Sequence, residues 1–156
     1  MMTFMQYFEN TTKRYFHGSR FQLPVGFKIT PQKNGYTSHP ETQKAERLLE
    51  KYRPTNKLSR SQSVFLVDDP ELIDFAGGYE DYIYEVQPVG KVEKSDLSWY
   101  SEIESIPSGG IYLDSYEEEI KQCALNYWND VPYYKPENSL FEYRTPAAII
   151  IGQIMS

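Results

Sequence analysis

The chain has little of what disulfides, metal centres and membrane spans require. Its 156 residues include one cysteine, Cys123, and two histidines, His17 and His39. A single cysteine excludes an intramolecular disulfide, and so few Cys and His side chains cannot complete a structural zinc site. The longest apolar run, Ala147–Ile151, is much shorter than the roughly 20 residues of a membrane-spanning helix. These absences predict a cytoplasmic protein that holds no metal and enters no membrane.

Basic charge is also scarce. The chain has 16 Lys and Arg against 22 Asp and Glu, a formal net charge of −6 and a sequence pI near 5.0. This balance argues against a continuous basic groove and therefore against a nucleic-acid partner. Aromatic residues are abundant instead, at 15% of the chain with 14 tyrosines. Because tyrosine is amphipathic, we expect part of this surplus to line a cleft or an interface.

The organisation of the chain predicts one domain over residues 1–156. The sequence shows no internal repeat and no dividing linker, and its length suffices to bury a core. Capping boxes followed by apolar residues at helical spacing predict two helices, Ser38–Tyr52 and Ser115–Trp128. Strand-like runs are found at Tyr15–Gly18, Phe21–Ile29, Gln62–Val67, Tyr82–Pro88 and Leu140–Ile154. Strands and helices do not alternate strictly, which favours an α+β fold over a doubly wound sheet.

Two further positions are suited to capping short helices. Asp69 precedes Pro70, a residue that fits the first helical position, and the Gly77–Gly78 pair would end that helix. Ser95 or Asp96 would begin a second helical turn.

Two segments place chemically capable side chains inside strand-like runs. His17 follows the aromatic residues Tyr15 and Phe16, and Glu142 precedes the apolar run Ala147–Ile151. A buried polar group without a partner costs roughly 1–3 kcal/mol, so a strand seldom carries one without a reason. A satisfied structural histidine and a solvated glutamate are the alternative interpretations of these two residues.

In chain order, several segments resemble motifs of the ADP-ribosyltransferases, in particular of the rifampicin-modifying enzymes and the poly(ADP-ribose) polymerase group. The similar segments are His17–Pro31, Ser63–Val67, Asp68–Tyr79, Ile83–Asp96, Tyr143–Thr145 and Ile151–Ile154. Together they cover most of the chain apart from residues 36–58 and 100–135. The resemblance implies a core split between two packed antiparallel sheets, with the helices outside.

The resemblance also implies that NAD⁺ is the substrate. In these families the residue that matches His17 hydrogen-bonds a ribose, and the backbone at the position of Gly18, next to Ser19, holds the nicotinamide carboxamide. Phe65 stands where the family has a tyrosine that stacks on nicotinamide, and stacking needs only the ring face. Tyr79 aligns with a second aromatic residue that closes the nicotinamide slot. An ordinary core phenylalanine and an ordinary helix-end tyrosine are the alternatives.

The catalytic acid has two candidates. Glu142 matches the glutamate of the polymerase-like branch without a gap. Asp96 matches the aspartate of the rifampicin-modifying branch only after a shift of one residue, and it also fits a helix cap. We take Glu142 as the acid and keep Asp96 as the alternate, and we expect His17, Phe65 and Glu142 to converge on one cleft.

The implied activity is mono-ADP-ribosylation, a glycosyl transfer from NAD⁺ to a protein or small-molecule acceptor, as in bacterial or phage effectors. Cleavage of the nicotinamide–ribose bond builds positive charge on the ribose, which a fixed carboxylate stabilises without a metal or a cysteine nucleophile. The basic segment Arg53–Arg60 would hold the pyrophosphate or form a solvated loop. An NAD⁺ glycohydrolase and a non-enzymatic binding protein are the alternatives, and Phe65 in place of tyrosine favours the second.

Overall fold

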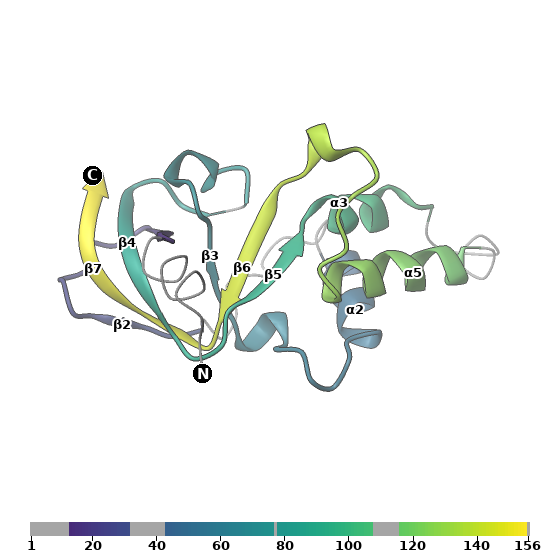
Figure 1. The fold of residues 1–156 in the computed structure, drawn as a ribbon, viewed down its shortest axis with the longest axis horizontal. Coiled ribbons are helices and arrows are strands. Elements are labelled where there is room, and N and C mark those ends of the chain that lie inside the picture. The colour runs from purple at the N-terminus through teal and green to yellow at the C-terminus, as the bar shows by residue number, and fades with distance from the viewer. Residues whose placement is uncertain (1–12, 32–42, 77, 108–115, 156) are drawn as a thin grey trace, which may run out of the picture.

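The structure is a computed structural model that describes residues 13–31, 43–76, 78–107 and 116–155. These ranges form two antiparallel sheets, one of them curled, and three α-helices, which confirms the predicted α+β class (Figure 1). None of these helices is long and apolar enough to cross a membrane. The strands are β1 (Tyr15–Ser19), β2 (Lys28–Ile29), β3 (Val64–Leu66), β4 (Tyr82–Val89), β5 (Glu93–Asp96), β6 (Phe141–Thr145) and β7 (Ala147–Met155). The α-helices are α2 (Gln43–Lys51), α3 (Ser98–Ser105) and α5 (Glu117–Trp128), and the 3₁₀ turns are η2 (Arg60–Gln62), η3 (Pro70–Leu72) and η4 (Pro136–Asn138).

Most of the predicted elements are present, with shorter bounds. The two predicted helices are α2 and α5, and the starts of their capping boxes, Ser38 and Ser115, lie outside the described residues. The predicted strand over Phe21–Ile29 is wrong for most of its length, since only β2 is paired. The chain turns at Gly26, within the segment Leu23–Gly26 for which the sequence predicts a turn or a sheet edge, and its φ of +91° suits glycine.

Two other predictions concerned capping and strand bounds. Asp69 caps η3 as predicted, because its side chain accepts a hydrogen bond from the backbone N–H of Glu71 at 3.0 Å. The run Leu140–Ile154 divides at Pro146 into β6 and β7. Residues of β5, for which we predicted the start of a helix, pair with β6 before α3 begins.

The two sheets are built largely from one bent hairpin. One sheet has the order β1-β4-β7-β2 and the other the order β3-β6-β5. The strands β4 and β5 follow one another in the chain, as do β6 and β7, so the same two chain segments pair in both sheets. An isolated bridge between Phe16 and Val67 also joins β1 to the chain just after β3.

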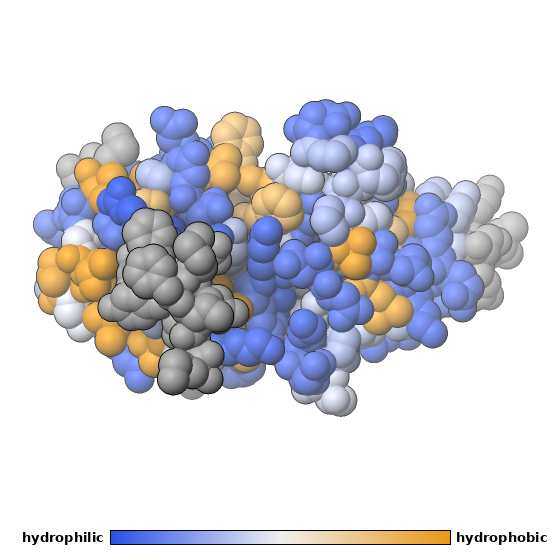
Figure 2. Space-filling view, viewed as in Figure 1, coloured by the Kyte–Doolittle hydropathy of each residue, from blue (hydrophilic) through white to orange (hydrophobic). Residues whose placement is uncertain are grey.

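Apolar side chains form two main cores. The cluster between the sheets contains Ile29, Val64, Leu66, Tyr84, Val86, Tyr143, Ala148 and Ile150. A second cluster lies among the helices, which stand together beside the three-stranded sheet in Figure 1. Figure 2 shows the matching surface, which is apolar over β2 and β7 and mainly hydrophilic over the helices. The three-stranded sheet therefore has one face toward each core.

Part of the tyrosine surplus is buried rather than placed at a cleft. Tyr84 and Tyr127 are fully buried, and Tyr143 is nearly so. Each hydroxyl has a hydrogen-bond partner: Tyr84 accepts from the backbone of Leu23, and Tyr143 donates to Asp68. Tyrosine here supplies apolar area and a satisfied polar group at the same time.

Gly18 in β1 is packed directly against the chain that follows η3. A Cβ atom at Gly18 would lie 1.9 Å from the carbonyl oxygen of Tyr79 and 2.7 Å from Cγ2 of Ile73. Backbone stands in the way, so only hydrogen fits at this position. Gly152 in β7 is a matched contrast, because a Cβ there would meet nothing within 4 Å.

Gly18→Ala should therefore lower the free energy of unfolding by about 1–3 kcal/mol, because the methyl group forces the backbone near Tyr79 to shift. Gly152→Ala should change it by no more than about 0.5–1 kcal/mol, in the stabilising direction if at all. Urea unfolding of the two variants and the parent protein measures both effects. Equal unfolding midpoints for the two variants would contradict this packing.

Candidate functional site

His17 is held in a defined orientation in the middle of β1. Its ring nitrogen Nδ1 lies 2.9 Å from the carbonyl oxygen of Phe65. A carbonyl only accepts, so Nδ1 carries the proton and the neutral ring leaves Nε2 as an acceptor. Burial lowers the pKa of His17 by more than the hydrogen bond to Phe65 raises it. The imidazole is therefore neutral at neutral pH and can accept a hydrogen bond from a ligand hydroxyl.

The pairing between β1 and the β3 segment stops beside His17. At the Phe16–Val67 bridge both backbone hydrogen bonds form, at 2.8 and 3.0 Å. Strand alternation points the backbone N–H and C=O of Gly18 to the same side as those of Phe16. Within the described residues, no backbone group pairs with Gly18 on that side. The edge thus presents one donor and one acceptor next to each other.

Exposed and polar groups surround this edge. The Tyr79 carbonyl lies against Gly18, and the Tyr79 side chain is 49% exposed. The Arg20 guanidinium stands 5.2 Å from the centre of the Tyr79 ring. Ser19 accepts a hydrogen bond from the backbone N–H of Phe21 at 3.0 Å. The structure therefore brings His17, Gly18, Ser19 and the Phe65 backbone together at this edge, while the Tyr79 backbone lies against the opposite face of β1 at Gly18.

The Phe65 side chain points away from the core between the sheets. Phe65 pairs with Arg144 of β6, whereas its neighbour Leu66 pairs with Tyr143 and packs between the sheets. The Phe65 ring consequently shares the helix-facing side of the sheet with Arg144. The guanidinium of Arg60 lies 4.7 Å from the centre of this ring.

Glu142 lies on the same helix-facing side and is almost completely buried, with 2% of its surface exposed. Its Oε2 atom pairs with Nη1 of Arg60 and accepts a hydrogen bond from the hydroxyl of Tyr127. Both interactions use this one oxygen, and Oε1 takes part in neither. Arg60 and Tyr127 therefore orient the carboxylate through Oε2.

Arg60 is the centre of these contacts. Its Nε donates to the carboxylate of Glu46 at 3.0 Å, and its Nη1 donates to Tyr127 at 2.5 Å as well as to Glu142. The ring of Tyr100 lies 5.1 Å away. Burial alone would lower the pKa of Arg60, but its interactions with Glu142, Tyr127 and Glu46 outweigh this effect and raise that pKa well above its usual value. The interpretation of this part of the basic segment as a solvated loop is wrong, because Arg60 is a buried, permanently charged group.

Arg144 forms a second buried ionic cluster on the same face. Its Nη1 donates to the backbone carbonyl of Leu58 at 2.7 Å and to Glu93 at 3.1 Å, and its Nη2 donates to Ser95 at 3.0 Å. The guanidinium also lies 4.8 Å from the ring of Trp128 in α5. The contact between sheet and helices is therefore ionic at its centre.

The predicted convergence of three side chains on one open cleft is not what the structure shows. His17 pairs with Tyr84, which is buried between the sheets, so the His17 ring is directed to that side. Phe65 and Glu142 are directed to the helix side, where Arg60 fills the space between them. The alternation of side chains along a strand separates His17 from the other two.

Asp96 is buried at the end of β5 and serves as a cap. Its Oδ1 accepts from the backbone N–H groups of Ser98 and Leu140, at 3.0 and 3.4 Å. Its Oδ2 accepts from the Ser139 hydroxyl at 2.7 Å and from the Tyr133 backbone at 3.1 Å. A carboxylate offers about four acceptor positions, and these four bonds occupy them. Asp96 fixes the start of α3 and the loop before β6, which is the alternative that the sequence left open.

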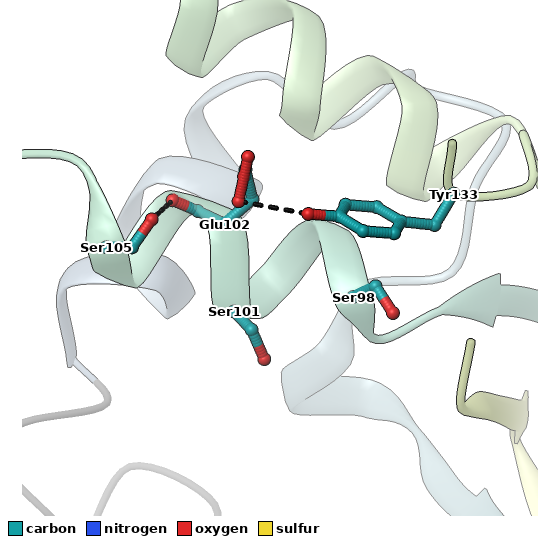
Figure 3. A pocket seen from close by; sticks show the side chains of 5 residues that line it. All are labelled: Ser98, Ser101, Glu102, Ser105 and Tyr133. Atoms are coloured by element: carbon teal, nitrogen blue, oxygen red, sulfur yellow. Dashed lines mark hydrogen bonds between the residues drawn. The ribbon is translucent and has the colours of Figure 1, made fainter. Parts of the chain in front are cut away.

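A separate surface hollow of about 370 Å³ lies on α3. Figure 3 shows its lining residues, and the Tyr133 hydroxyl there donates to Glu102 at 3.2 Å. The hollow is lined by Ser98, Ser101, Glu102, Ser105 and Tyr133. None of the predicted site residues is among them.

The buried arginines and carboxylates on the helix-facing side of the three-stranded sheet form an ionic layer, which consists of Glu46, Arg60, Glu93, Glu142 and Arg144. Of these, only Glu142 was identified from the sequence as a candidate site residue, and the rest of the layer was missed. Arg144 and Glu142 are two residues apart in β6, as Glu93 and Ser95 are in β5, and this spacing places each pair on one face of its strand. Polar residues at alternate positions beside an apolar run were the available signal. Glu46 gave no such signal, because its neighbours on α2 indicated only a helix face.

The pKa of Asp96 generates a pH prediction. Burial alone would raise this pKa, but hydrogen bonds from Ser139, Ser98 and Tyr133 outweigh it and hold the pKa below its usual value. Such a group stabilises the fold fully above its unfolded pKa of about 3.9 and loses this effect as the pH falls through the folded value.

Asp96→Asn should accordingly lower the free energy of unfolding at pH 7 by about 1–3 kcal/mol. The difference from the parent protein should shrink as the pH falls below about 4. Urea unfolding across this range measures it. A difference that stays constant down to pH 3 would show that the Asp96 charge does not matter.

In the described ranges, no group of three or more His, Cys, Asp or Glu side chains is placed to hold a metal ion. The chain matches no protein-family model, and no curated protein matches it significantly.

Proposed function

We propose that this protein is a mono-ADP-ribosyltransferase that uses NAD⁺ as its substrate. The observation that carries the proposal is the backbone edge of Gly18, which no backbone group of the described residues pairs, beside an oriented, neutral His17. A carboxamide has an N–H₂ donor and a carbonyl acceptor, which complement the C=O and N–H of one residue. Nicotinamide is the part of NAD⁺ that carries this group.

The neighbouring side chains fit the rest of the substrate. The Nε2 atom of His17 can accept a hydrogen bond from a ribose hydroxyl, because the Phe65 carbonyl holds the proton on Nδ1. Arg20 and Tyr79 offer an exposed cation and a half-exposed ring near Gly18. The Arg20 cation can pair with the pyrophosphate of NAD⁺, and the Tyr79 ring can stack on an aromatic ring of the substrate.

The chemistry needs a carboxylate and no general acid. The C1′–N bond breaks, its electron pair leaves with nicotinamide as a neutral molecule, and positive charge develops on the ribose. The acceptor then bonds to C1′ and releases its proton to water. Glu142 can stabilise the ribose charge in a state in which Arg60 has moved aside, and its Oε1 is the oxygen that neither Arg60 nor Tyr127 bonds in this structure. Asp96 has no acceptor position left for a substrate.

Incubation of the purified protein with adenylate-labelled NAD⁺, with and without cell lysate, tests this function. Label on a protein or small molecule supports transfer, whereas free ADP-ribose alone would indicate an NAD⁺ glycohydrolase. If calorimetry detects no binding of NAD⁺ and no product forms, the proposed activity is wrong and a non-enzymatic binding protein becomes the better hypothesis.

We expect Glu142→Gln to reduce turnover of NAD⁺ by about 10²–10³, because the amide keeps the size of the carboxylate but not its charge. Binding of NAD⁺ by calorimetry should change much less. Asp96→Asn is the matched control, and at equal folded fractions it should keep most of the turnover. Should Asp96→Asn abolish turnover while Glu142→Gln retains it, the catalytic acid is Asp96 and the assignment of Glu142 is wrong.

A further inference from the structure

We propose that Arg60 is an autoinhibitory contact, whose guanidinium occupies the place that the cationic nicotinamide end of NAD⁺ takes during the reaction. This inference rests on the proposed function. It concerns the state of the site before substrate enters, and it explains why the carboxylate and the ring that the reaction needs are both covered.

One cation, the guanidinium of Arg60, covers two groups with complementary roles. The Arg60 guanidinium lies 4.7 Å from the centre of the Phe65 ring and pairs with the carboxylate of Glu142. In NAD⁺ the positive charge is on the nicotinamide ring, and during cleavage it spreads to the ribose next to it. Phe65 provides a ring face for the nicotinamide charge, and Glu142 provides a carboxylate for the ribose charge.

The guanidinium of Arg60 also resembles the nicotinamide ring of NAD⁺ in shape. A guanidinium is flat and its charge is delocalised, so it stacks on aromatic faces and pairs with carboxylates in the same plane. A pyridinium ring is also flat and cationic. Arg60 therefore satisfies Phe65 and Glu142 in a way that a lysine ammonium, a compact charge, does not.

The Arg60 side chain also limits access to Glu142. Glu142 is 2% exposed, and the Arg60 side chain that covers it is 11% exposed. Glu46 and the ring of Tyr100 hold the far side of the guanidinium, at 3.0 and 5.1 Å. A substrate reaches Glu142 only after Arg60 moves, so closure lowers the apparent affinity for NAD⁺ by the fraction of open molecules.

The position of Arg60 in the chain allows this movement without unfolding of the sheet. Arg60 begins η2, a turn of three residues between α2 and β3. The neighbouring Leu58 is anchored separately, since its N–H donates to Glu93 and its carbonyl accepts from Arg144. Leu58 thus remains attached to the sheet through Glu93 and Arg144 when the Arg60 side chain leaves its site.

The test removes the guanidinium and measures two quantities. Carbodiimide coupling of an amine to carboxylates, mapped by mass spectrometry, reports whether Glu142 is accessible. Calorimetry reports the Kd for NAD⁺. The variant is Arg60→Gln, and Arg53→Gln is the control, because Arg53 also pairs with a glutamate, Glu50, but at the surface. If Arg60→Gln alone does not fold, the double variant with Glu46→Gln removes the charge and its second carboxylate together.

We expect Glu142 to be protected in the parent protein and in Arg53→Gln, and to be labelled in the Arg60 variant. The Kd for NAD⁺ should fall about tenfold or more in the Arg60 variant, as for a site that is open in at most about a tenth of resting molecules.

Other outcomes separate the two proposals. Two results overturn autoinhibition and make Arg60 a positioning residue at most. One is protection of Glu142 from labelling in the folded Arg60 variant. The other is an accessible Glu142 in that variant together with weaker NAD⁺ binding by the unlabelled variant than by the parent protein. Labelling of Glu142 without NAD⁺ binding to any of these proteins overturns the proposed transferase and supports the closure of Glu142 by Arg60.

Discussion

Two largely buried arginines join the three-stranded sheet to the helices, Arg60 through ion pairs and Arg144 through the ring of Trp128, and the other features of the molecule depend on this contact. Arg60 and Arg144 are surrounded by three carboxylates, those of Glu46, Glu93 and Glu142. An unpaired buried charge costs several kcal/mol, so neither arginine tolerates the loss of its partners. Because a guanidinium donates in a fixed planar fork, these pairs also define how the sheet and the helices lie relative to each other.

The ionic layer divides the apolar interior into the core between the sheets and the core among the helices. Alternation along β6 makes this division, since Tyr143 packs between the sheets while Glu142 and Arg144 face the helices. The same alternation divides the candidate site. His17 and the Gly18 edge belong to the curled sheet, whereas the acid belongs to the ionic layer. Any substrate that uses both must enter where β1 and β3 separate.

Stability and proposed activity therefore draw on the same groups. The carboxylate best placed for chemistry is also a partner of a buried arginine, and opening it for a substrate removes an interaction that stabilises the fold. Proteins commonly show this opposition between a stable site and an active one. Asp96 contributes to stability alone, because its four hydrogen bonds connect β5, α3 and the loop before β6.

The sequence by itself determined the α+β class, most strands, the bodies of α2 and α5, and the caps at Asp69 and Asp96. These depend on periodicity and on neighbours in the chain, which a sequence displays directly. Only the tertiary structure decided which face each strand presents, that Arg60 is buried, and that it covers Phe65 and Glu142. Those features join residues up to 82 positions apart, as Arg60 and Glu142 are. Pairing over such a separation depends on sheet register and layer packing, which local pattern does not specify.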